Sequence, residues 1–568
     1  MNVNKVAFPG HAASGAEYRH PRPWSESIEP AVLPELLAEA TVRHARRPLV
    51  EFLGATYSYA DIYDEACRFA AGLKRDGIGK GDRVGLFMPN VPAYVSAYYG
   101  AMMAGAVVVN FSPLYSVEEL SHQVADSGTR VLVTLDVPAL LPTAEKVLDA
   151  STLERLIVSH LADALPTFKS AGLRLFKRGD LAKIPARPDV VEWSDALAHA
   201  GWTEWLDGEA PGVNDLALLQ YTGGTTGTPK GAMLTHANLS SNARQVNAID
   251  PFDQAEPDVV MGGLPLFHVF ANTCVLNRTI LRGGTMVMVP RFEPKLVLSE
   301  IERCQVTAFP GVPTMYQALL DHPSCATTDF SALKICISGG APLSGKLREE
   351  FGRRTGVRLI EGYGLTESSG VVSTNPYQGE FKPGTIGQLL PGTRAILLDK
   401  EDPGKLAPEG QPGELALSGP QMMDGYWNRP ASGNEVFVTH HEARWLRTGD
   451  VAEIDADGFL SIVDRMKDMI AVGGFKVFPS QVEEVLLQHE AVKEVLVIGV
   501  PDAYRGEAPR AYATLIDDKE IDEMMLAEWL NARIGKHERV DKVVIRDELP
   551  RTMIGKLDRK ALRNEVLG

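Results

Sequence analysis

One stretch in the middle of the chain brings together the groups that a polyphosphate site needs. The sequence YTGGTTGTPKG, residues 221–231, combines threonine hydroxyls, glycines and the ammonium of Lys230. Hydroxyls and the backbone N–H groups that glycines leave accessible bind phosphate oxygens, and a fixed positive charge neutralises them. The stretch is not a Walker A loop, because Pro229 precedes Lys230 and Gly231 follows it. The alternative for such a composition is a threonine- and glycine-rich surface linker.

Other candidate groups follow expected strands or lie on turns. LIEGYGLTESSG, residues 359–370, predicts a strand and a glycine turn ahead of Thr366 and Glu367, and a carboxylate near a polyphosphate loop is a natural Mg²⁺ ligand. His268 follows a strand that ends near Pro265, where a lone histidine is typical of a hydrogen-bonded structural residue. Lys556 lies on a glycine-flanked turn near the C-terminus, where a lysine ordinarily faces solvent.

The elements that must position these groups alternate between helix and strand. Between residues 32 and 112, helix patterns alternate with apolar strands such as RVGLFMP, which predicts an α/β sheet with helices on its faces. Loops rich in glycine and proline follow the later strands, at the carboxyl ends where open α/β sheets bind ligands. From about residue 385, short strands with Gly, Pro and Asp turns predict a small barrel or sandwich.

The length of the chain predicts more than one domain. A chain of 568 residues exceeds what one hydrophobic core usually supports. Past Asp464 the sequence has the helix and strand alternation of a small α+β unit with its own core. We therefore expect residues 1–463 to form a large N-terminal domain and residues 464–568 to form a small C-terminal domain.

The charge and the cysteines narrow the classes of function. A net charge of −16 without a long basic run disfavours nucleic-acid binding. The five cysteines are odd in number and have no CxxC spacing, which indicates a reducing cytosol. The N-terminus has no apolar stretch of signal-peptide length, and no run of about 18 uncharged apolar residues occurs. We expect a cytoplasmic protein, soluble or peripheral on the inner face of a membrane.

Residues 165–187 invert the local charge of this acidic chain. Lysines and arginines alternate there with Phe168, Leu173, Leu175 and Phe176. One interpretation is a solvated connector with a few buried apolar anchors. The other is a short amphipathic element at a lipid surface, where Lys and Arg meet anionic head groups while Phe and Leu enter the interface.

Five stretches resemble one superfamily in the same order: YTGGTTGTPKG, EGYGLTE, RTGD, DRMKDMI with GGFKVFP, and PRTMIGK. They resemble the adenylate-forming enzymes, which include acyl-CoA synthetases, luciferases and peptide-synthetase adenylation domains, over about residues 30–565. The resemblance implies a large N-terminal domain of two αβ sheets plus a distorted β-barrel, and a small mobile α+β C-terminal domain. MPNVPAY, LPLFHVFA, SGGAPLS and the basic insertion are most similar to bacterial long-chain fatty-acid–CoA ligases.

The resemblance also implies roles for the motif residues. Those implied to bind ATP or AMP are Thr222, Gly223, Gly224, Thr225, Thr226, Gly227, Lys230, Gly339, Gly340, Ala341, Tyr363, Gly364, Thr366, Asp450 and Arg465. Those implied to act in catalysis are Lys556, Thr366, His268 and Lys230, with Glu367 as the Mg²⁺ ligand. The implied acyl pocket consists of His268, Phe270, Gly311, Val312 and Gly339. Lys467 would be the hinge, and the CoA-facing loop would contain Gly473, Gly474 and Lys476.

The implied reaction has two halves. A long- or medium-chain fatty acid attacks the α-phosphorus of ATP to give acyl-AMP and pyrophosphate, and CoA then displaces AMP. The expected ligands are ATP, Mg²⁺, CoA and the fatty acid, and the further expected contacts are a membrane surface through residues 165–187 and a second copy in a homodimer. The alternatives are an aryl- or hydroxycinnamate-type CoA ligase and a carrier-dependent acyl-adenylating enzyme.

Overall fold

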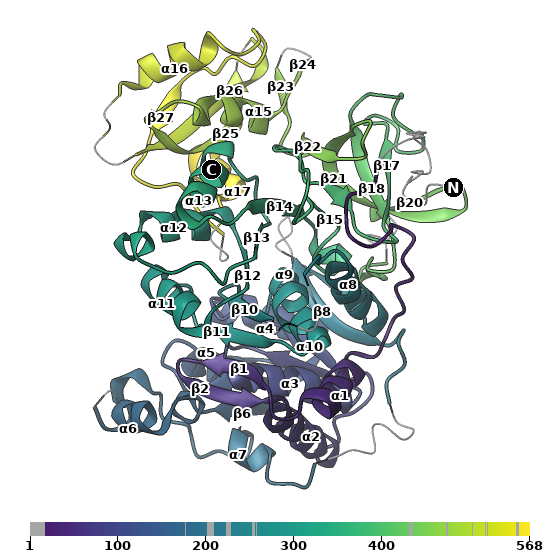
Figure 1. The fold of residues 1–568 in the computed structure, drawn as a ribbon, viewed down its shortest axis with the longest axis vertical. Coiled ribbons are helices and arrows are strands. Elements are labelled where there is room, and N and C mark those ends of the chain that lie inside the picture. Colours follow the sequence, from purple (N-terminus) through teal and green to yellow (C-terminus); the bar gives the residue numbers. More distant parts are fainter. Residues whose placement is uncertain are drawn as a thin grey trace.

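The computed structural model has four sheets. It describes residues 17–176, 178–201, 210–222, 229–252, 256, 258–430, 435–472, 475–502, 504–516, 519, 521–552 and 556–568. Two large sheets form the body, a five-stranded sheet packs beside them, and another five-stranded sheet lies in the C-terminal lobe at the upper left of Figure 1. The expected α/β class, with a large N-terminal part and a smaller C-terminal one, is confirmed.

The first large sheet has the order β19-β9-β8-β4-β3-β5-β6-β7. Its strands are β3 (Arg83–Leu86), β4 (Val107–Asn110), β5 (Thr129–Leu135), β6 (Arg155–Ser159), β7 (Val190–Glu192), β8 (Leu216–Thr222), β9 (Lys230–Thr235) and β19 (Gly425–Tyr426). The helices between them are α2 (Tyr59–Arg75), α3 (Pro92–Met103), α4 (Val117–Ser127), α5 (Leu141–Ala150) and α7 (Trp193–Ala196). The strands from β8 to β7 run parallel, and β9 turns back antiparallel to β8.

The second large sheet has the order β16-β15-β14-β13-β12-β10-β11-β1-β2. Its strands are β1 (Pro48–Phe52), β2 (Ala55–Ser58), β10 (Val259–Gly262), β11 (Thr285–Met288), β12 (Ala308–Gly311), β13 (Ile335–Ser338), β14 (Leu359–Tyr363), β15 (Ser373–Thr374) and β16 (Gln388–Leu389). The associated helices are α1 (Leu33–His44), α8 (His236–Ala248), α9 (Val269–Ala271), α10 (Arg278–Arg282), α11 (Pro294–Cys304), α12 (Pro313–Asp321) and α13 (Gly345–Thr355).

Helix α3 shows how the core joins the two sheets. All of its residues are buried, because the sequence PAYVSAYYGAMM carries no charge on any face. Its tyrosine hydroxyls find partners across the core: Tyr94 donates to Asn110 on β4 at 2.8 Å, and Tyr98 donates to Asn272 at 3.0 Å. Hydrogen bonds to such buried hydroxyls fix the helix between the two sheets.

The two small sheets follow in the chain. The turn-rich stretch, which predicts a small barrel or sandwich, forms a five-stranded sheet with no closing strand pair among the described residues, called here the barrel-like sheet. It contains β17 (Arg394–Leu398), β18 (Gly413–Ser418), β20 (Phe437–His440), β21 (Ala443–Ile454) and β22 (Leu460–Arg465). The C-terminal lobe contains β23 (Ile470–Val472), β24 (Phe475–Val477), β25 (Val492–Asp502), β26 (Gly506–Leu515) and β27 (Val543–Ile545), with α15 (Pro479–Leu487), α16 (Glu523–Asn531) and α17 (Arg559–Leu567). Its two hydrophobic clusters contain only residues from 470 onward.

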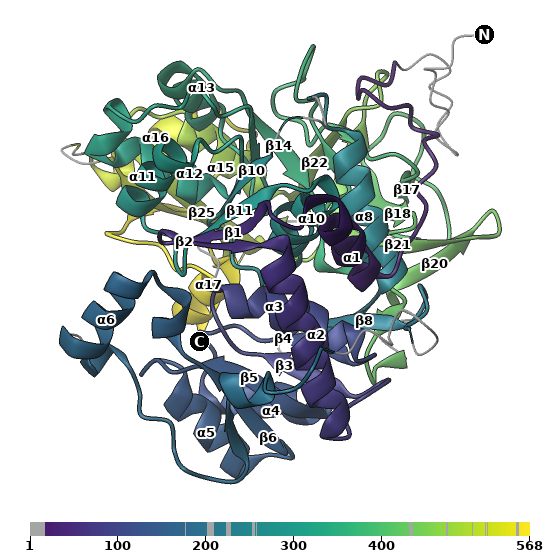
Figure 2. The ribbon, with the colours of Figure 1, turned by 60° about the horizontal axis from the view of Figure 1, so that its bottom comes forward.

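Helix α6 (Thr167–Phe176) stands clear of the body at the lower left of Figure 1 and at the left of Figure 2. None of its residues is buried. Among the described helices, none is both long enough and apolar enough to cross a bilayer.

Candidate active site

The expected strand, loop and strand around the threonine- and glycine-rich stretch form an antiparallel hairpin. Thr222 at the end of β8 lies opposite Lys230 at the start of β9. The connecting residues that were expected to hold phosphates lie outside the described part of the chain: Gly223, Gly224, Thr225, Thr226 and Gly227. The hairpin therefore fixes both ends of that loop, and Lys230 is half-buried at one of them.

Three adjacent parallel strands end at the same edge of the second sheet. In the register, Gly311 lies beside Ser338, and Ser338 lies beside Glu361. The residues after these strand ends are Val312, the pair Gly339 and Gly340 with Ala341, and Tyr363 with Gly364. The sheet thus brings the expected adenine-site and acyl-site residues to one edge, as the glycine-rich loops predict.

At this edge, two positions require glycine because another part of the chain lies too close for a side chain. A Cβ on Gly364 would lie 1.8 Å from the carbonyl oxygen of Gly370. Gly340 has a φ of +79°, and a Cβ there would lie 2.5 Å from Nζ of Lys556. A side chain at position 340 would therefore be strained and would also displace the lysine.

Lys556 reaches this edge from the C-terminal lobe. It lies on a turn in which Thr552 N–H donates to the Lys556 carbonyl at 2.7 Å, and it is half-buried rather than solvent-facing. Burial, with the nearby Arg465 guanidinium, lowers the pKa of Lys556 to about 8. The structure therefore places a lysine with an accessible neutral form directly against Gly340.

His268 lies in the same region. Its Nδ1 accepts the Phe270 N–H at 3.4 Å, and it caps the short helix α9. Burial and the adjacent Lys556 lower the pKa of His268 to about 3, so it is neutral at physiological pH. The Phe270 ring packs against Gly339, where a Cβ would come within 3.0 Å of it. Gly311 faces the ring of the buried Tyr316 in the same way, at 3.0 Å.

Thr366 and Glu367 begin the short 3₁₀ turn that follows β14. The Met423 N–H donates to the Glu367 carbonyl at 2.8 Å, and the Tyr426 hydroxyl donates to Glu367 Oε1 at 2.6 Å. Tyr426 also lies beneath Lys230, whose Nζ is 5.2 Å from the ring centroid. Sequence reasoning missed Tyr426, since nothing in DGYW resembles a ligand pattern.

Asp450 is buried within β21. It lies opposite Arg465 in the strand register, with Arg465 Nε 3.1 Å from Oδ1, and Tyr363 donates its hydroxyl to Oδ2 at 2.5 Å. The Asp450 carboxylate raises the pKa of Arg465. Sequence reasoning also missed two acidic residues near this pair. Glu414 binds Arg447 at 2.7 Å just ahead of Thr448 in β21, and Asp464 accepts the Ser480 N–H at 2.8 Å.

Lys467 lies between residues that are tied to different parts of the molecule. Met466 N–H donates to the Gly449 carbonyl in the barrel-like sheet at 2.9 Å, whereas Asp468 pairs with Arg559 on α17 at 2.9 Å. Burial, with the nearby Arg465, lowers the pKa of Lys467. Of the expected CoA-facing loop, Gly473 and Gly474 lie outside the described residues, and for Lys476 only the backbone, in β24, is described.

Comparison with known sequences decides the family. The sequence profile of AMP-binding enzymes matches residues 37–427, and that of the AMP-binding enzyme C-terminal domain matches residues 481–556. The chain belongs to the AMP-binding enzyme family. Together with the relatives, this membership confirms the expected enzyme class, an AMP-forming acyl-CoA ligase that uses ATP and CoA.

The relatives of this AMP-binding enzyme differ in the acids that their names specify. A long-chain-fatty-acid–CoA ligase of Bacillus subtilis (strain 168) is 37% identical over 97% of each chain. A feruloyl-CoA synthase of Amycolatopsis sp is 35% identical over 90% of this chain and 94% of its own. The crystal structure of ATP-bound MatB from Rhodopseudomonas palustris matches with a TM-score of 0.80 at 29% identity, covering 94% of this chain and 98% of its own.

The lipid-surface interpretation of residues 165–187 expects lysines and arginines to face lipid head groups, and the structure places those of α6 differently. Lys169 donates to the Leu53 carbonyl at 2.7 Å and Arg174 pairs with Asp163, so both basic groups that the structure describes on α6 contact the protein. Phe168, Leu175 and Phe176 are 74%, 62% and 86% exposed. The apolar face of α6 therefore points to solvent, while Lys177 and the side chain of Arg178 lie outside the described residues.

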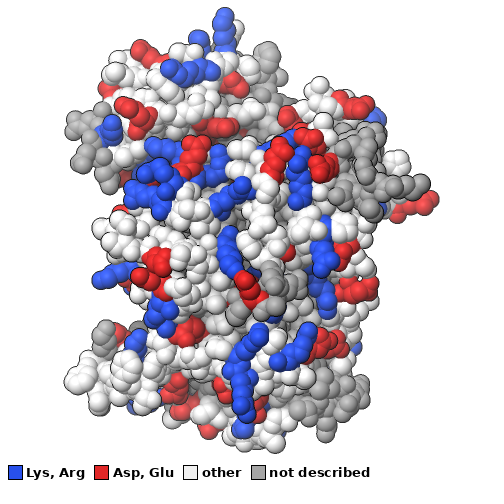
Figure 3. All heavy atoms as spheres, viewed as in Figure 1, with Lys and Arg blue, Asp and Glu red and all other residues white. Residues whose placement is uncertain are grey.

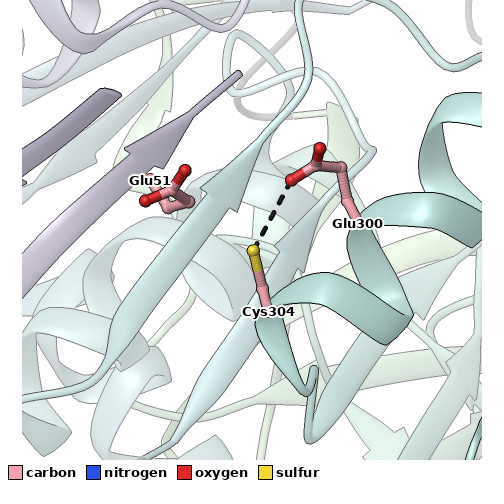
Figure 4. Close-up of side chains that lie close together, drawn as sticks. All are labelled: Glu51, Glu300 and Cys304. Atoms are coloured by element: carbon pink, nitrogen blue, oxygen red, sulfur yellow. Dashed lines mark hydrogen bonds between the residues drawn. The ribbon is translucent and has the colours of Figure 1, made fainter. Parts of the chain in front are cut away.

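Three residues of types that can bind a metal lie close together away from this site: Glu51 on β1, and Glu300 and Cys304 on α11 (Figure 4). The two carboxylates already have partners. Arg303 donates to both, at 2.8 Å for Glu51, and Thr56 donates to Glu51 at 2.7 Å. Burial is the main cause that raises the pKa of Cys304 to about 12, which keeps its thiol protonated. The cluster is therefore an ion-pair network centred on Arg303.

Proposed function

We propose that this AMP-binding enzyme activates a long- or medium-chain fatty acid as acyl-AMP and transfers the acyl group to CoA. One observation carries the proposal. Lys556 from the C-terminal lobe lies against Gly340, with Arg465 and His268 beside it, at the carboxyl end of strands β12 to β14 of the second sheet. An ammonium placed there meets charge that develops on the α-phosphoryl group. The fatty-acid assignment is supported by the B. subtilis relative.

The other groups take roles that follow from their chemistry. Asp450 with Arg465 suits a ribose diol, since a carboxylate and a guanidinium offer an acceptor and donors side by side. Lys230 and the hairpin loop would hold the β- and γ-phosphates. Tyr363 and Gly339 to Ala341 would frame adenine. His268, being neutral, would shape the carboxylate end of the acyl pocket without contributing charge.

The donor set at Thr366 and Glu367 fits Mg²⁺. The ion prefers oxygen ligands and is commonly held by one or two carboxylates together with substrate phosphates. Among the described residues, only Oε1 of the Glu367 carboxylate accepts a hydrogen bond, so Oε2 is available as a ligand atom. When bound, the ion supplies charge neutralisation for the triphosphate. The remaining positioning is done by Thr366, Lys230 and Lys556.

We further propose that the C-terminal lobe beyond Lys467 turns as a unit about that residue between the two half-reactions, while residues 464–466 stay with the barrel-like sheet. The bonds from Met466 to Gly449 and from Asp468 to Arg559 lie on either side of Lys467, so rotation there leaves both in place. The orientation described here suits adenylation, because Lys556 is in the site. The other orientation would bring the loop of Gly473, Gly474 and Lys476 to the thiol.

The identity of the acid gives the direct test. The kcat/KM for CoA-dependent AMP formation is measured for a panel of carboxylic acids from acetate to oleate, together with coumarate and ferulate. Each added CH₂ that is buried contributes about 0.8 kcal/mol, so four more carbons should raise kcat/KM by on the order of 100-fold until the pocket is full. Aromatic acids that exceed every C8 to C18 acid by tenfold would instead favour the aryl-CoA ligase. Pyrophosphate release without CoA-dependent AMP release would favour the carrier-dependent enzyme.

We also propose that α6 is the peripheral membrane contact, through its apolar face. Of the apolar side chains that were expected to insert, Phe168, Leu175 and Phe176 are exposed on one short helix that stands out from the body, whereas Leu173 is half-buried (Figure 2). Lys169 and Arg174 are bonded to the protein although both stay exposed, so we expect insertion of apolar surface to contribute more than charge attraction.

Replacing Phe168 and Phe176 together by serine should therefore weaken binding to phosphatidylglycerol-containing liposomes by on the order of 100-fold, since burying each phenyl ring contributes about 1.5 to 3 kcal/mol. Co-sedimentation at low and high salt measures it. Val42→Ser, on the helix α1, removes an equally exposed apolar side chain elsewhere and should leave binding unchanged. Absence of liposome binding by the unmodified protein at low salt would refute the contact.

A further inference from the structure

Tyr426 contacts both halves of the expected metal and triphosphate site. Its hydroxyl donates to Glu367 Oε1 at 2.6 Å, and its ring lies 5.2 Å from Nζ of Lys230. We infer that Tyr426 is a positioning residue, which holds the carboxylate of Glu367 and the ammonium of Lys230 in the arrangement that a metal-bound triphosphate requires. The inference rests on the proposed placement of Mg²⁺ and the triphosphate at Glu367 and Lys230.

The backbone of Tyr426 is fixed independently of Glu367. Strand β19 pairs with β9, with Tyr426 opposite Ala232, and the Trp427 N–H donates to the Gly231 carbonyl at 2.8 Å. The Trp427 indole N–H donates to the Asp126 carbonyl at 3.1 Å, which anchors the same segment to the end of α4. The tyrosine is therefore attached to the phosphate hairpin, and it constrains Glu367 relative to that hairpin.

The hydrogen bond sets which carboxylate oxygen faces the ligand. Because Oε1 accepts the Tyr426 hydroxyl and the Met423 N–H holds the Glu367 carbonyl at 2.8 Å, the side chain is fixed at both ends. Groups that orient a metal ligand in this way usually change metal affinity by about 10- to 100-fold.

The ring acts on the other side of the site. A lysine ammonium over an aromatic face is attracted to it, so the ring holds the Lys230 ammonium on its own side of the site. Tyr426→Phe retains this contact and removes only the hydroxyl. Tyr426→Leu removes both contacts. The two variants therefore separate the effect on Glu367 from the effect on Lys230.

The test measures Mn²⁺ binding, by electron paramagnetic resonance, to the full-length enzyme with a non-hydrolysable ATP analogue. Tyr426→Phe should weaken Mn²⁺ binding about tenfold and raise the KM for Mg²⁺ in acyl-AMP formation, with the KM for the fatty acid unchanged. Tyr426→Leu should in addition raise the KM for ATP. In a Glu367→Gln background, loss of the hydroxyl should have no further effect on Mn²⁺ affinity, because its partner is already altered.

Tyr59→Phe is the matched control, since it removes a buried hydroxyl that donates to the Gly284 carbonyl at 2.8 Å and touches none of these residues. It should leave Mn²⁺ affinity unchanged. Equal Mn²⁺ affinity in Tyr426→Phe and the unmodified enzyme, or an equal loss with and without Glu367→Gln, would overturn the inference. If the Mn²⁺ results are as expected but no acid is adenylated, the positioning role stands and the proposed reaction fails.

Discussion

Lys556→Ala should reduce acyl-AMP formation by about 10² to 10³, the usual loss when one charge-stabilising donor is removed from a transition state. Thioester formation from acyl-AMP supplied ready-made should be nearly unaffected, because in the proposed second orientation the lysine has left the site. Pyrophosphate release and thioester detection time the two half-reactions separately. Lys560→Ala removes an exposed lysine from the same stretch and should change neither.

The same lysine predicts a pH dependence. Only the ammonium form can stabilise the phosphoryl charge, and the pKa of Lys556 is lowered to about 8. The kcat/KM for adenylation, which reports the free enzyme, should therefore fall as the pH rises through about 8. Lys556→Arg should abolish that fall, because a guanidinium stays protonated.

Equal loss in both half-reactions for Lys556→Ala would mean that the lysine is structural and that the two orientations must be abandoned.

Asp450→Ala should raise the KM for ATP by on the order of 100-fold, with a smaller change in the KM for the fatty acid. The substitution removes the acceptor of the Tyr363 hydroxyl and the partner of Arg465, and with them the proposed ribose contact. A hydrogen bond to a charged group contributes about 1.5 to 3 kcal/mol. ATP–pyrophosphate exchange at varied ATP gives the KM.

A control for this prediction lies on the hairpin that joins β21 to β22. Asp457 pairs with Lys382 at 2.5 Å and its side chain is 49% exposed. Asp457→Ala should therefore leave the KM for ATP unchanged. If both variants lose ATP affinity equally, the effect comes from the stability of the barrel-like sheet, and the ribose assignment is wrong.

Local sequence patterns were sufficient to predict those parts of the site that are formed by a single short segment of the chain. The strand, loop and strand around Lys230, the turn after β14 and the turn that carries Lys556 each lie within a short stretch, so spacing and glycines predict them. Contacts between distant segments were not predictable in this way. Tyr426 and Glu367 are 59 positions apart, and no periodicity relates them. The burial of Lys556 likewise depends on how the C-terminal lobe docks.

Helix α6 shows another limit. The alternation of apolar and basic residues predicts an amphipathic element, but periodicity does not state which face contacts the protein. In the structure the bonds from Lys169 to Leu53 and from Arg174 to Asp163 orient the helix with its phenylalanines outward. The proposed membrane contact therefore depends on apolar side chains instead of charged ones. The variants that test it accordingly replace phenylalanines and not lysines or arginines.

The N-terminal segment affects how the chain can be made. Tyr18 donates its hydroxyl to the Leu389 carbonyl, 371 positions later. Strand β1 pairs with β11, and strands β3 to β9 of the first sheet lie between these two strands in the sequence. At translation rates of about 5 to 20 residues per second, the partner of Tyr18 leaves the ribosome roughly 20 to 70 seconds after it. Strand β1 can pair at once with β2, which follows it directly, but its other edge waits for β11 and Tyr18 waits for Leu389. The segment around Tyr18 and this edge of β1 therefore reach their final contacts late, and the open strand edge needs protection from association during that interval.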